Sequence, residues 1–282
     1  MSCRKRLNRA YRQAVHLTLD PCCKYAIISD CHRGCGTAND NFLKNQHLHF
    51  AAMEYYYKKG FFHIELGDGE ELWENYDTER IRECHSNVYW MFYLFETKHR
   101  LIRVFGNHDM ELKGKNVTYP VASACNSQPV ASGFEECVLL ENNRGRDICL
   151  LHGHQADTFN SVFWKVSRFL VRYLGKPLER FGVNDPTSAA RNYQKQKTYE
   201  ACMAAWAEEM DMYLIAGHSH RPALSEEGGL YINAGSCVHP RCITAIEIEN
   251  QSILLVKWSV TTRPDMTLCV ERNVLAGPVV IT

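Results

Sequence analysis

Runs of apolar residues alternate with longer stretches of mixed polarity in the first third of the chain. The runs over 25–30, 61–66 and 101–105 have the length of buried strands. The stretch that ends at Gly60 and the stretch over 76–99 are long enough for helices, and a glycine is common just beyond a helix end. This alternation of strands and helices predicts a largely parallel sheet.

The pattern changes in the second half of the chain. Two short apolar runs, over 138–140 and 148–151, flank the polar turn Asn-Asn-Arg-Gly and predict a hairpin. Residues 156–210 contain no strand pattern and are predicted to be wholly helical. A further strand is predicted over 213–216, and 230–260 has the pattern of two or three more.

These elements divide the chain into four parts. Residues 1–24 are predicted to form a basic helical leader. Residues 25–155 and 211–262 together form the α/β core, and residues 156–210 are a helical cap inserted into it. Residues 263–282 complete the chain as a C-terminal strand or tail.

The composition and the net charge of the chain argue against several classes of function. Lys and Arg number 32, as do Asp and Glu, so no extended nucleic-acid partner is expected. No apolar run approaches the roughly 18 residues of a membrane-spanning helix. The basic start is not followed by the apolar segment of a signal peptide. We therefore expect a cytoplasmic protein whose 13 cysteines are mainly buried free thiols.

Polar side chains of one kind stand at the ends of five predicted strands. The carboxyl ends of strands in an open α/β sheet face one crevice, so these side chains are expected to lie close together. The five motifs are Asp30-Cys-His32, Gly67-Asp68, Gly106-Asn107-His108-Asp109, His152-Gly-His154 and Gly217-His218-Ser-His220.

The chemistry of this set is that of a metal site. Imidazoles mixed with carboxylate or amide oxygens suit Mn, Fe, Zn or Co better than Ca²⁺ or a thiolate-bound ion. A carboxylate such as Asp68 can bridge two ions about 3.5–4 Å apart, as hydrolytic two-metal sites require. Any one motif alone would be explained better by a helix-capping acid or a packed histidine, but five in order favour the metal site.

Taken together, the motifs resemble the signature of the calcineurin-like metallophosphoesterase superfamily: D-x-H, G-D, G-N-H-[D/E], a His-Gly pair and G-H-x-H, in that order. The resemblance implies a four-layer α/β sandwich, with two mixed sheets flanked by helices, into which the helical cap is inserted. It also implies two divalent transition-metal ions as cofactors, Mn in the first instance with Fe or Zn as alternatives.

The resemblance assigns ligands residue by residue. It gives one ion Asp30, His32 and His220, gives the other Asn107, His152 and His218, and makes Asp68 the bridge. His154 is an alternative to His152.

A hydrolytic reaction follows from this assignment. Two cations lower the pKa of a shared water to ~7, and the resulting hydroxide attacks phosphorus. His108, next to the ligand Asn107, would protonate the leaving oxygen. Asp109 would either hold the tautomer of His108 or cap the following helix.

Two longer matches point to a substrate. Two segments are similar to the UDP-2,3-diacylglucosamine hydrolase branch, which cleaves a pyrophosphate in lipid A synthesis. They are Gly67-Asp-Gly-Glu-Glu-Leu-Trp73, and Gly217-His-Ser-His-Arg221-Pro222 followed later by Tyr231-Ile-Asn-Ala-Gly-Ser236. In this interpretation Glu71, Trp73 and Arg221 contact substrate. A helix-start carboxylate, a core aromatic and a surface ion pair explain these three residues as well.

The branch usually has Arg where this chain has His108, so other functions are retained. They are a protein or small-molecule phosphomonoesterase or phosphodiesterase, and a non-catalytic scaffold of the same fold.

The cap carries basic residues at helical spacing, namely Lys165, Arg168, Arg172 and Lys176. Gly175 and Pro177 are predicted to end this helix, and Asp185-Pro186 to start another. The basic face is either simply solvated, or Arg168 and Arg172 meet substrate phosphates or an anionic membrane surface while apolar neighbours accept an acyl chain. The expected partner is a phosphorylated small molecule or lipid-linked substrate, with peripheral membrane contact through the cap.

Overall fold

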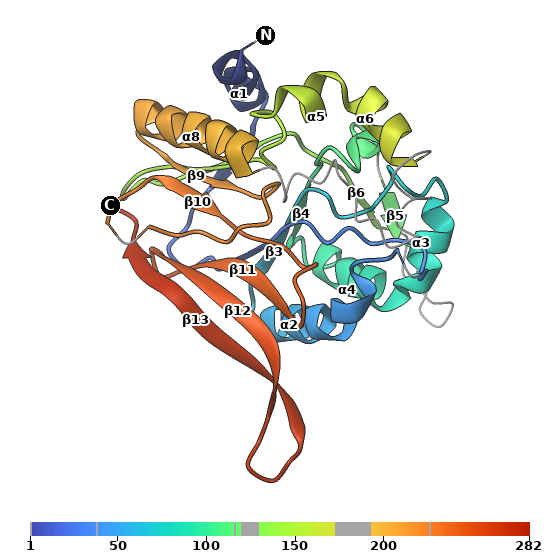
Figure 1. Cartoon of the computed structure of the whole chain (residues 1–282). Coiled ribbons are helices and arrows are strands. Elements are labelled where there is room, and N and C mark those ends of the chain that lie inside the picture. The colour runs from blue at the N-terminus through green and yellow to red at the C-terminus, as the bar shows by residue number, and fades with distance from the viewer. Residues whose placement is uncertain (1, 38, 116, 120–129, 173–192, 226) are drawn as a thin grey trace.

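The computed structural model describes residues 2–37, 39–115, 117–119, 130–172, 193–225 and 227–282. Two sheets pack face to face, and helices cover the outer face of each, so the molecule has four layers (Figure 1). This architecture confirms the expected sandwich of two mixed sheets flanked by helices. Among the helices of the described residues, none is long and apolar enough to cross a membrane.

The first sheet has six strands in the order β13-β12-β11-β2-β3-β4. Strands β2, β3 and β4 run parallel, as the sequence pattern predicts, whereas β11, β12 and β13 each run antiparallel to their neighbours. The bounds are β2 (Tyr25–Ile28), β3 (Phe62–Leu66), β4 (Leu101–Val104), β11 (Cys242–Glu249), β12 (Ser252–Thr262) and β13 (Leu268–Val280).

The second sheet has five strands in the order β1-β7-β8-β9-β10, with only the β7–β8 pair antiparallel. The bounds are β1 (Val15–Thr18), β7 (Val138–Glu141), β8 (Ile148–Leu150), β9 (Tyr213–Ala216) and β10 (Tyr231–Asn233). Strands β5 (Val117–Tyr119) and β6 (Val130–Ser132) form a separate pair.

The helices lie outside the sheets. Helices α2 and α4 pack on the outer face of the first sheet, and α1 and α8 lie along the second (Figure 1). The bounds are α1 (Cys3–Arg12), α2 (Gln46–Lys58), α3 (Thr78–Cys84), α4 (Ser86–Glu96), α5 (Thr158–Val162), α6 (Trp164–Leu170) and α8 (Tyr193–Met210), with 3-10 turns η1 (Leu43–Asn45) and η2 (Met110–Leu112).

Strand β2 shows how the core is divided. Its four residues are all buried, and they alternate between two apolar clusters. Tyr25 and Ile27 belong to the cluster between the sheets, and Ala26 and Ile28 belong to the cluster beneath α2 and α4. Because successive side chains of a strand point to opposite faces, a strand covered on both sides is apolar throughout.

Two predicted elements differ in detail. The helix expected over 76–99 is two helices, because the backbone of His85 leaves the helical conformation while its buried ring contacts the Asp40 carboxylate at 2.9 Å. The N-terminal leader contains the strand β1 as well as a helix. Its mostly exposed residues, at the edge of the second sheet, give no buried-strand pattern.

The cysteine prediction holds in part. Ten described cysteines are free thiols, but only four of these are buried, and Cys3 of α1 and Cys202 of α8 form a disulfide. This pairing joins segments far apart in the sequence, because α1 and α8 lie side by side on the second sheet. Spacing along the chain carries no signal for it.

The part predicted as a cap contains α5, α6 and α8. The predicted helix end at Gly175 and Pro177, the basic residue Lys176 and the helix start at Asp185-Pro186 lie outside the described residues. Residues 263–282 contain β13, which pairs with β12 in a long hairpin that projects from the body (Figure 1).

Candidate metal centre

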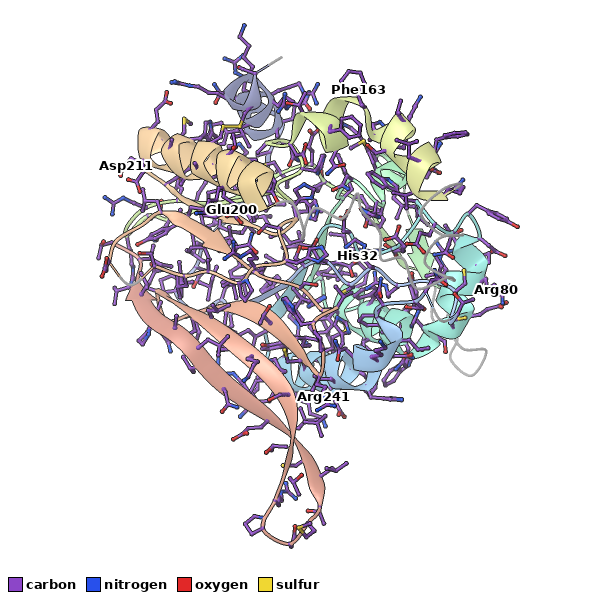
Figure 2. The ribbon with its side chains drawn as sticks, viewed as in Figure 1. His32, Arg80, Phe163, Glu200, Asp211 and Arg241 are labelled. Carbon is purple, nitrogen blue, oxygen red and sulfur yellow. A yellow bond between two sulfur atoms is a disulfide. The ribbon has the colours of Figure 1, made fainter. Side chains whose placement is uncertain are left out.

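The loops that follow five strands meet between the two sheets. Asp30 follows β2, Asp68 follows β3 and Asn107 follows β4 in the first sheet, whereas His152 follows β8 and His218 follows β9 in the second. All five side chains are buried. Figure 2 places His32, two residues after Asp30, in this central region.

One group of side chains consists of Asp30, His32 and His220. Nε2 of His220 lies 3.0 Å from Oδ1 of Asp30 and 3.3 Å from Nε2 of His32. Nε2 of His32 is 3.8 Å from the same Asp30 oxygen. Three ligand atoms that converge from two loops of different sheets form a candidate site for one cation.

A second group consists of Asp68, His152 and His218. Nδ1 of His152 donates a hydrogen bond of 2.8 Å to the carbonyl of Leu66, which leaves its Nε2 unprotonated in the neutral ring. That Nε2 lies 3.1 Å from Oδ2 of Asp68. A neighbouring hydrogen bond that fixes the tautomer in this way is typical of metal-binding histidines.

Asp68 connects the two groups. Its Oδ2, which faces His152, is also 3.8 Å from Nε2 of His32 in the first group. Its Oδ1 accepts a hydrogen bond of 2.8 Å from the backbone N–H of His108. One carboxylate therefore adjoins both groups, as the predicted bridge requires.

Asn107 and His154 have different relations to these groups. Oδ1 of Asn107 is buried and makes no hydrogen bond within the described residues, so it is available to a cation. His154 belongs to neither group, although its ring lies 5.7 Å from that of His152. The geometry therefore favours His152 over His154 as a ligand.

The backbone at these positions is strained. Five of the seven predicted ligands have a positive φ: Asp30 (54°), His32 (48°), Asp68 (51°), His218 (67°) and His220 (58°). Residues with a Cβ rarely adopt this conformation, and each such residue costs on the order of 1–3 kcal/mol. Strain of this kind gathers where function fixes the direction of a side chain.

Two glycines allow the loops to pack this closely. A Cβ on Gly106 would collide with the Asp68 carboxylate, and a Cβ on Gly217 would collide with the side chains of Ser29 and Asp30. The glycines in the two motifs therefore make room for the acids of the neighbouring loops.

The carboxylates and imidazoles of the cluster stabilise each other's charged forms. Burial alone would raise the pKa of Asp30 and Asp68, but nearby imidazoles, chiefly those of His220 and His152, hold both pKa values well below the usual range. The same carboxylates raise the pKa of His152 to about 9, although burial acts in the opposite direction. Independently of these shifts, a donor set of imidazole, carboxylate and amide suits divalent transition metals.

Glu71 has a role that the sequence did not indicate. Its Oε1 lies 2.7 Å from Nδ1 of His108, and its Oε2 lies 2.6 Å from Nδ1 of His32. Charge from both rings holds the pKa of this buried carboxyl far below its usual range, against desolvation. Glu71 therefore orients His108 and His32 together. Its position three residues after Asp68 is the sequence feature that could have indicated this role.

Trp73 also acts on His108. The two rings are stacked, with centroids 4.1 Å apart and an interplanar angle of 21°. The indole Nε1–H donates a hydrogen bond of 2.7 Å to the carbonyl of Asn107. Glu71 and Trp73 thus hold His108 from two directions, and their contact with substrate stays a prediction.

Asp109 does not have either of its predicted roles. Its carboxylate accepts backbone hydrogen bonds from Gly69 at 2.7 Å and Gly106 at 2.6 Å, and it makes no side-chain cap to the helical turn η2. Burial, with Asp68 and Glu70 nearby, raises its pKa to about 7. Asp109 ties two of the loops together, because its side chain points toward their backbone and Glu71 occupies the position beside His108.

Two of the predicted substrate-binding arginines are engaged with other parts of the fold. Arg168 pairs with Glu111, and Arg172 donates to the carbonyls of Leu72 at 2.6 Å and Trp73 at 2.9 Å. Arg172 therefore fastens α6 to the loop that carries Glu71 and Trp73. Arg221 is exposed immediately after His220.

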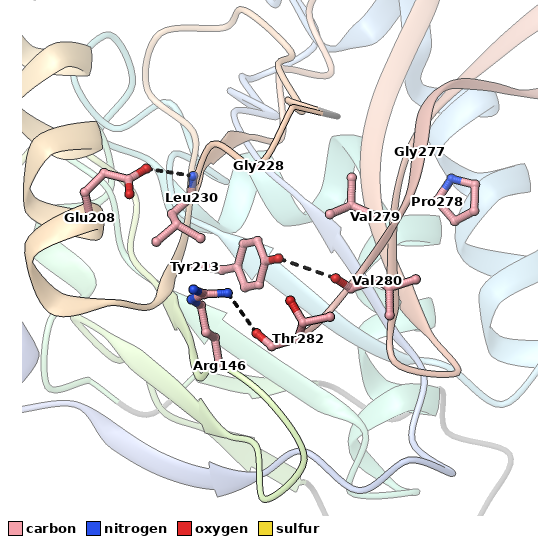
Figure 3. Close-up of a pocket in the computed structure, with 10 residues that line it drawn as sticks. All are labelled: Arg146, Glu208, Tyr213, Gly228, Leu230, Gly277, Pro278, Val279, Val280 and Thr282. Carbon is pink, nitrogen blue, oxygen red and sulfur yellow. Dashed lines mark hydrogen bonds between the residues drawn. The ribbon is translucent and has the colours of Figure 1, made fainter.

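A pocket of about 470 Å³ lies elsewhere, where α8 and β9 approach the end of β13 (Figure 3). Its polar groups are already engaged: Glu208 accepts from the N–H of Leu230 at 3.3 Å, and Arg146 donates to the carbonyl of Thr282 at 3.0 Å. None of the predicted site residues lines it. The convergence of strand ends, rather than this pocket, marks the candidate functional site.

Comparison with known families decides what the chain is related to. Residues 24–251 match the calcineurin-like phosphoesterase superfamily domain. The chain belongs to this superfamily. The matched residues include all five strand-end motifs, and the superfamily's capacity to bind divalent metals agrees with the two ligand groups.

Other comparisons add little. No curated protein matches the chain. Among solved structures, Vps29 of Chaetomium thermophilum is similar at 12% identity and a TM-score of 0.39, covering 92% of this chain and 100% of that one. The same protein complexed with the RaPID-derived cyclic peptide RT-D3 is similar at 12% identity and a TM-score of 0.37, covering 91% and 98%.

Proposed function

We propose that this member of the calcineurin-like phosphoesterase superfamily is a metal-dependent hydrolase of phosphoric ester or pyrophosphate bonds. The observation that carries the proposal is the pair of ligand groups joined through Asp68, with His108 held beside them by Glu71. Asp30, His32 and His220 would hold one divalent ion, Asn107, His152 and His218 the other, and Asp68 would contact both.

The bound ions and the residues of the chain would have separate roles in the reaction. When bound, two such ions stabilise phosphoryl charge and lower the pKa of water, which supplies the nucleophile at neutral pH. His108 donates a proton to the leaving oxygen through Nε2, because its Nδ1–H is held by the Glu71 carboxylate. Trp73 covers one face of the ring and keeps it in place.

A substrate screen tests this proposal. The full chain, loaded with Mn²⁺, should hydrolyse at least one class among phosphomonoesters, phosphodiesters, nucleotide-sugar pyrophosphates and phosphopeptides. Activity should disappear on chelation and return with Mn²⁺, Fe²⁺ or Zn²⁺. If a metal-loaded, folded chain has no activity on any of these classes, it is a scaffold of the same fold.

Within this screen, the substrate class that we propose is a nucleotide-sugar-lipid pyrophosphate. The similarity of the Gly67–Trp73 and His218–Pro222 segments to the UDP-2,3-diacylglucosamine hydrolase branch supports it. So does the surface of α5 and α6, where Phe159, Phe163, Val166 and Phe169 are each at least half exposed. An acyl chain would cover these four apolar side chains. Arg172, just beyond α6, donates a hydrogen bond to the carbonyl of Trp73 and so connects this surface to the loop that carries Glu71.

Replacing Phe163 and Phe169 together by Ser tests the acyl contact. The KM for a diacylated nucleotide-sugar substrate should rise roughly tenfold or more, since each buried apolar side chain contributes about 1.5–3 kcal/mol. Hydrolysis of a small nitrophenyl ester should not change. The control removes Met266 and Leu268, two still more exposed apolar side chains on the projecting hairpin. An unchanged KM in the Phe variant would leave these side chains without a role in substrate binding.

A further inference from the structure

A further cluster of side chains that could bind a metal, separate from the groups around Asp30, Asp68 and Glu71, lies in the core beneath the first sheet. Cys31, His49 and Cys237 are fully buried, and their ligand atoms lie within 4.8 Å of one another. Cys31 stands between Asp30 and His32 in sequence. Its side chain belongs to the core cluster beneath α2 and α4 and not to either ligand group of the candidate metal centre.

The geometry within this cluster resembles that of ligands around one ion. Sγ of Cys31 lies 3.7 Å from Nε2 of His49, a separation that suits two ligands placed about 2.0–2.3 Å from a tetrahedral ion. The backbone N–H of Cys237 donates to the carbonyl of Asp30 at 3.2 Å, so the two cysteine loops are bound together. Asn45 donates to the carbonyl of Cys237 at 2.7 Å and fixes the second loop against α2.

His49 supplies the nitrogen ligand of the cluster. Its ring is completely buried, and its Nε2 faces Sγ of Cys31, so Nε2 is the atom that would bind the ion. Burial and the nearby His63 and Arg33 hold the pKa of His49 well below its usual range, so the ring is neutral. A neutral imidazole has the lone pair that a metal ligand needs.

Charge balance permits a divalent ion here. Arg33, whose charge acts on both cysteines, is already paired with Glu65 at 2.6 Å and lies 3.4 Å from Glu70. Two thiolates would neutralise a Zn²⁺ ion, and a neutral complex can be buried at little cost. We propose that Cys31, His49 and Cys237 bind a structural Zn²⁺ ion, separate from the two ions of the hydrolytic centre.

Such an ion would link three parts of the fold. It would join α2 to the loop after β2 and to the loop after β10, directly behind Asp30 and His32. Its role would be to hold this strained loop in place, whether or not the chain is a hydrolase.

Cobalt substitution tests the third site on the full chain. Metal-free protein loaded with Co²⁺ should show thiolate-to-cobalt charge transfer in the near ultraviolet, which a site of imidazole and carboxylate ligands cannot produce. The band should persist in Asp68→Asn, which impairs the hydrolytic centre alone. It should disappear in Cys237→Ser. With Zn²⁺, the wild type should hold about three ions per chain and Cys237→Ser about two.

Cys149→Ser is the matched control, because Cys149 is equally buried and its Sγ lies 3.4 Å from that of Cys137 in the other core cluster. This variant should keep both the band and the third ion. Absence of the band from cobalt-loaded wild type would overturn the proposal without reference to any variant's folding. Persistence of the band in a folded Cys237→Ser protein would also overturn it. A Cys31–Cys237 disulfide in the freshly purified chain would do the same.

Discussion

Asp68→Asn is expected to lower metal content and phosphoesterase activity together. The carboxylate lies between the two ligand groups, and an amide cannot supply the negative charge that a bridge between two cations needs. Removing even an indirect supporting partner costs 10–100-fold in metal affinity, so we expect a loss of more than about 100-fold in activity at limiting metal. Elemental analysis of protein purified without chelator, with activity measured against added Mn²⁺, gives both quantities.

The control for this variant is Asp40→Asn. Asp40 is also a buried aspartate that contacts an imidazole, that of His85, but it belongs to neither ligand group. It should therefore lower stability without changing the ion content of the folded fraction. If Asp68→Asn remained fully active after exhaustive chelation, the two-ion centre would not be the source of the activity.

His108→Ala should keep the ions and lose catalysis. General acid catalysis contributes typically 10²–10⁴-fold, and we expect a loss in kcat of this size for substrates with alkyl leaving groups. Nitrophenyl esters need little protonation of the leaving oxygen, so their loss should be much smaller. Steady-state kinetics across a series of leaving groups, with ion content measured in parallel, distinguishes this role from that of a ligand.

Glu71→Gln should show the same dependence on leaving group, because Gln cannot hold the Nδ1–H of His108 as a carboxylate does. His16→Ala is a suitable control, since it removes another histidine–carboxylate pair, with Glu141, on the edge strand β1. An equal loss for good and poor leaving groups in His108→Ala would mean that His108 is not the acid.

The parts of the structure that local pattern determines were predictable. Five short apolar runs, each ending in or closely followed by Asp, Asn or His, indicated both the strands and the meeting point of Asp30, Asp68 and His152. A strand buried on both faces is apolar throughout, and strand ends in such sheets converge, so sequence order alone carries this information.

The rest depends on contacts between distant segments. Glu71 and Asp109 are both acids near His108 in sequence, and only the path of the loops places the first beside its ring and the second against the backbone. The disulfide of Cys3 depends on two helices that pack 199 residues apart in sequence. The charges of Arg168 and Arg172 looked free in sequence because their partners, Glu111 and two loop carbonyls, lie across the cap boundary.

The left-handed backbone at Asp30, His32, Asp68, His218 and His220 has an evolutionary consequence. Glycine adopts this conformation freely, so glycine at any of these positions would relieve roughly 1 kcal/mol of strain while it removed a ligand. Selection for stability and selection for hydrolysis therefore favour different residues at the same positions. In a lineage that no longer required the reaction, these positions should be among the first to drift, and their drift would leave a more stable, inactive descendant.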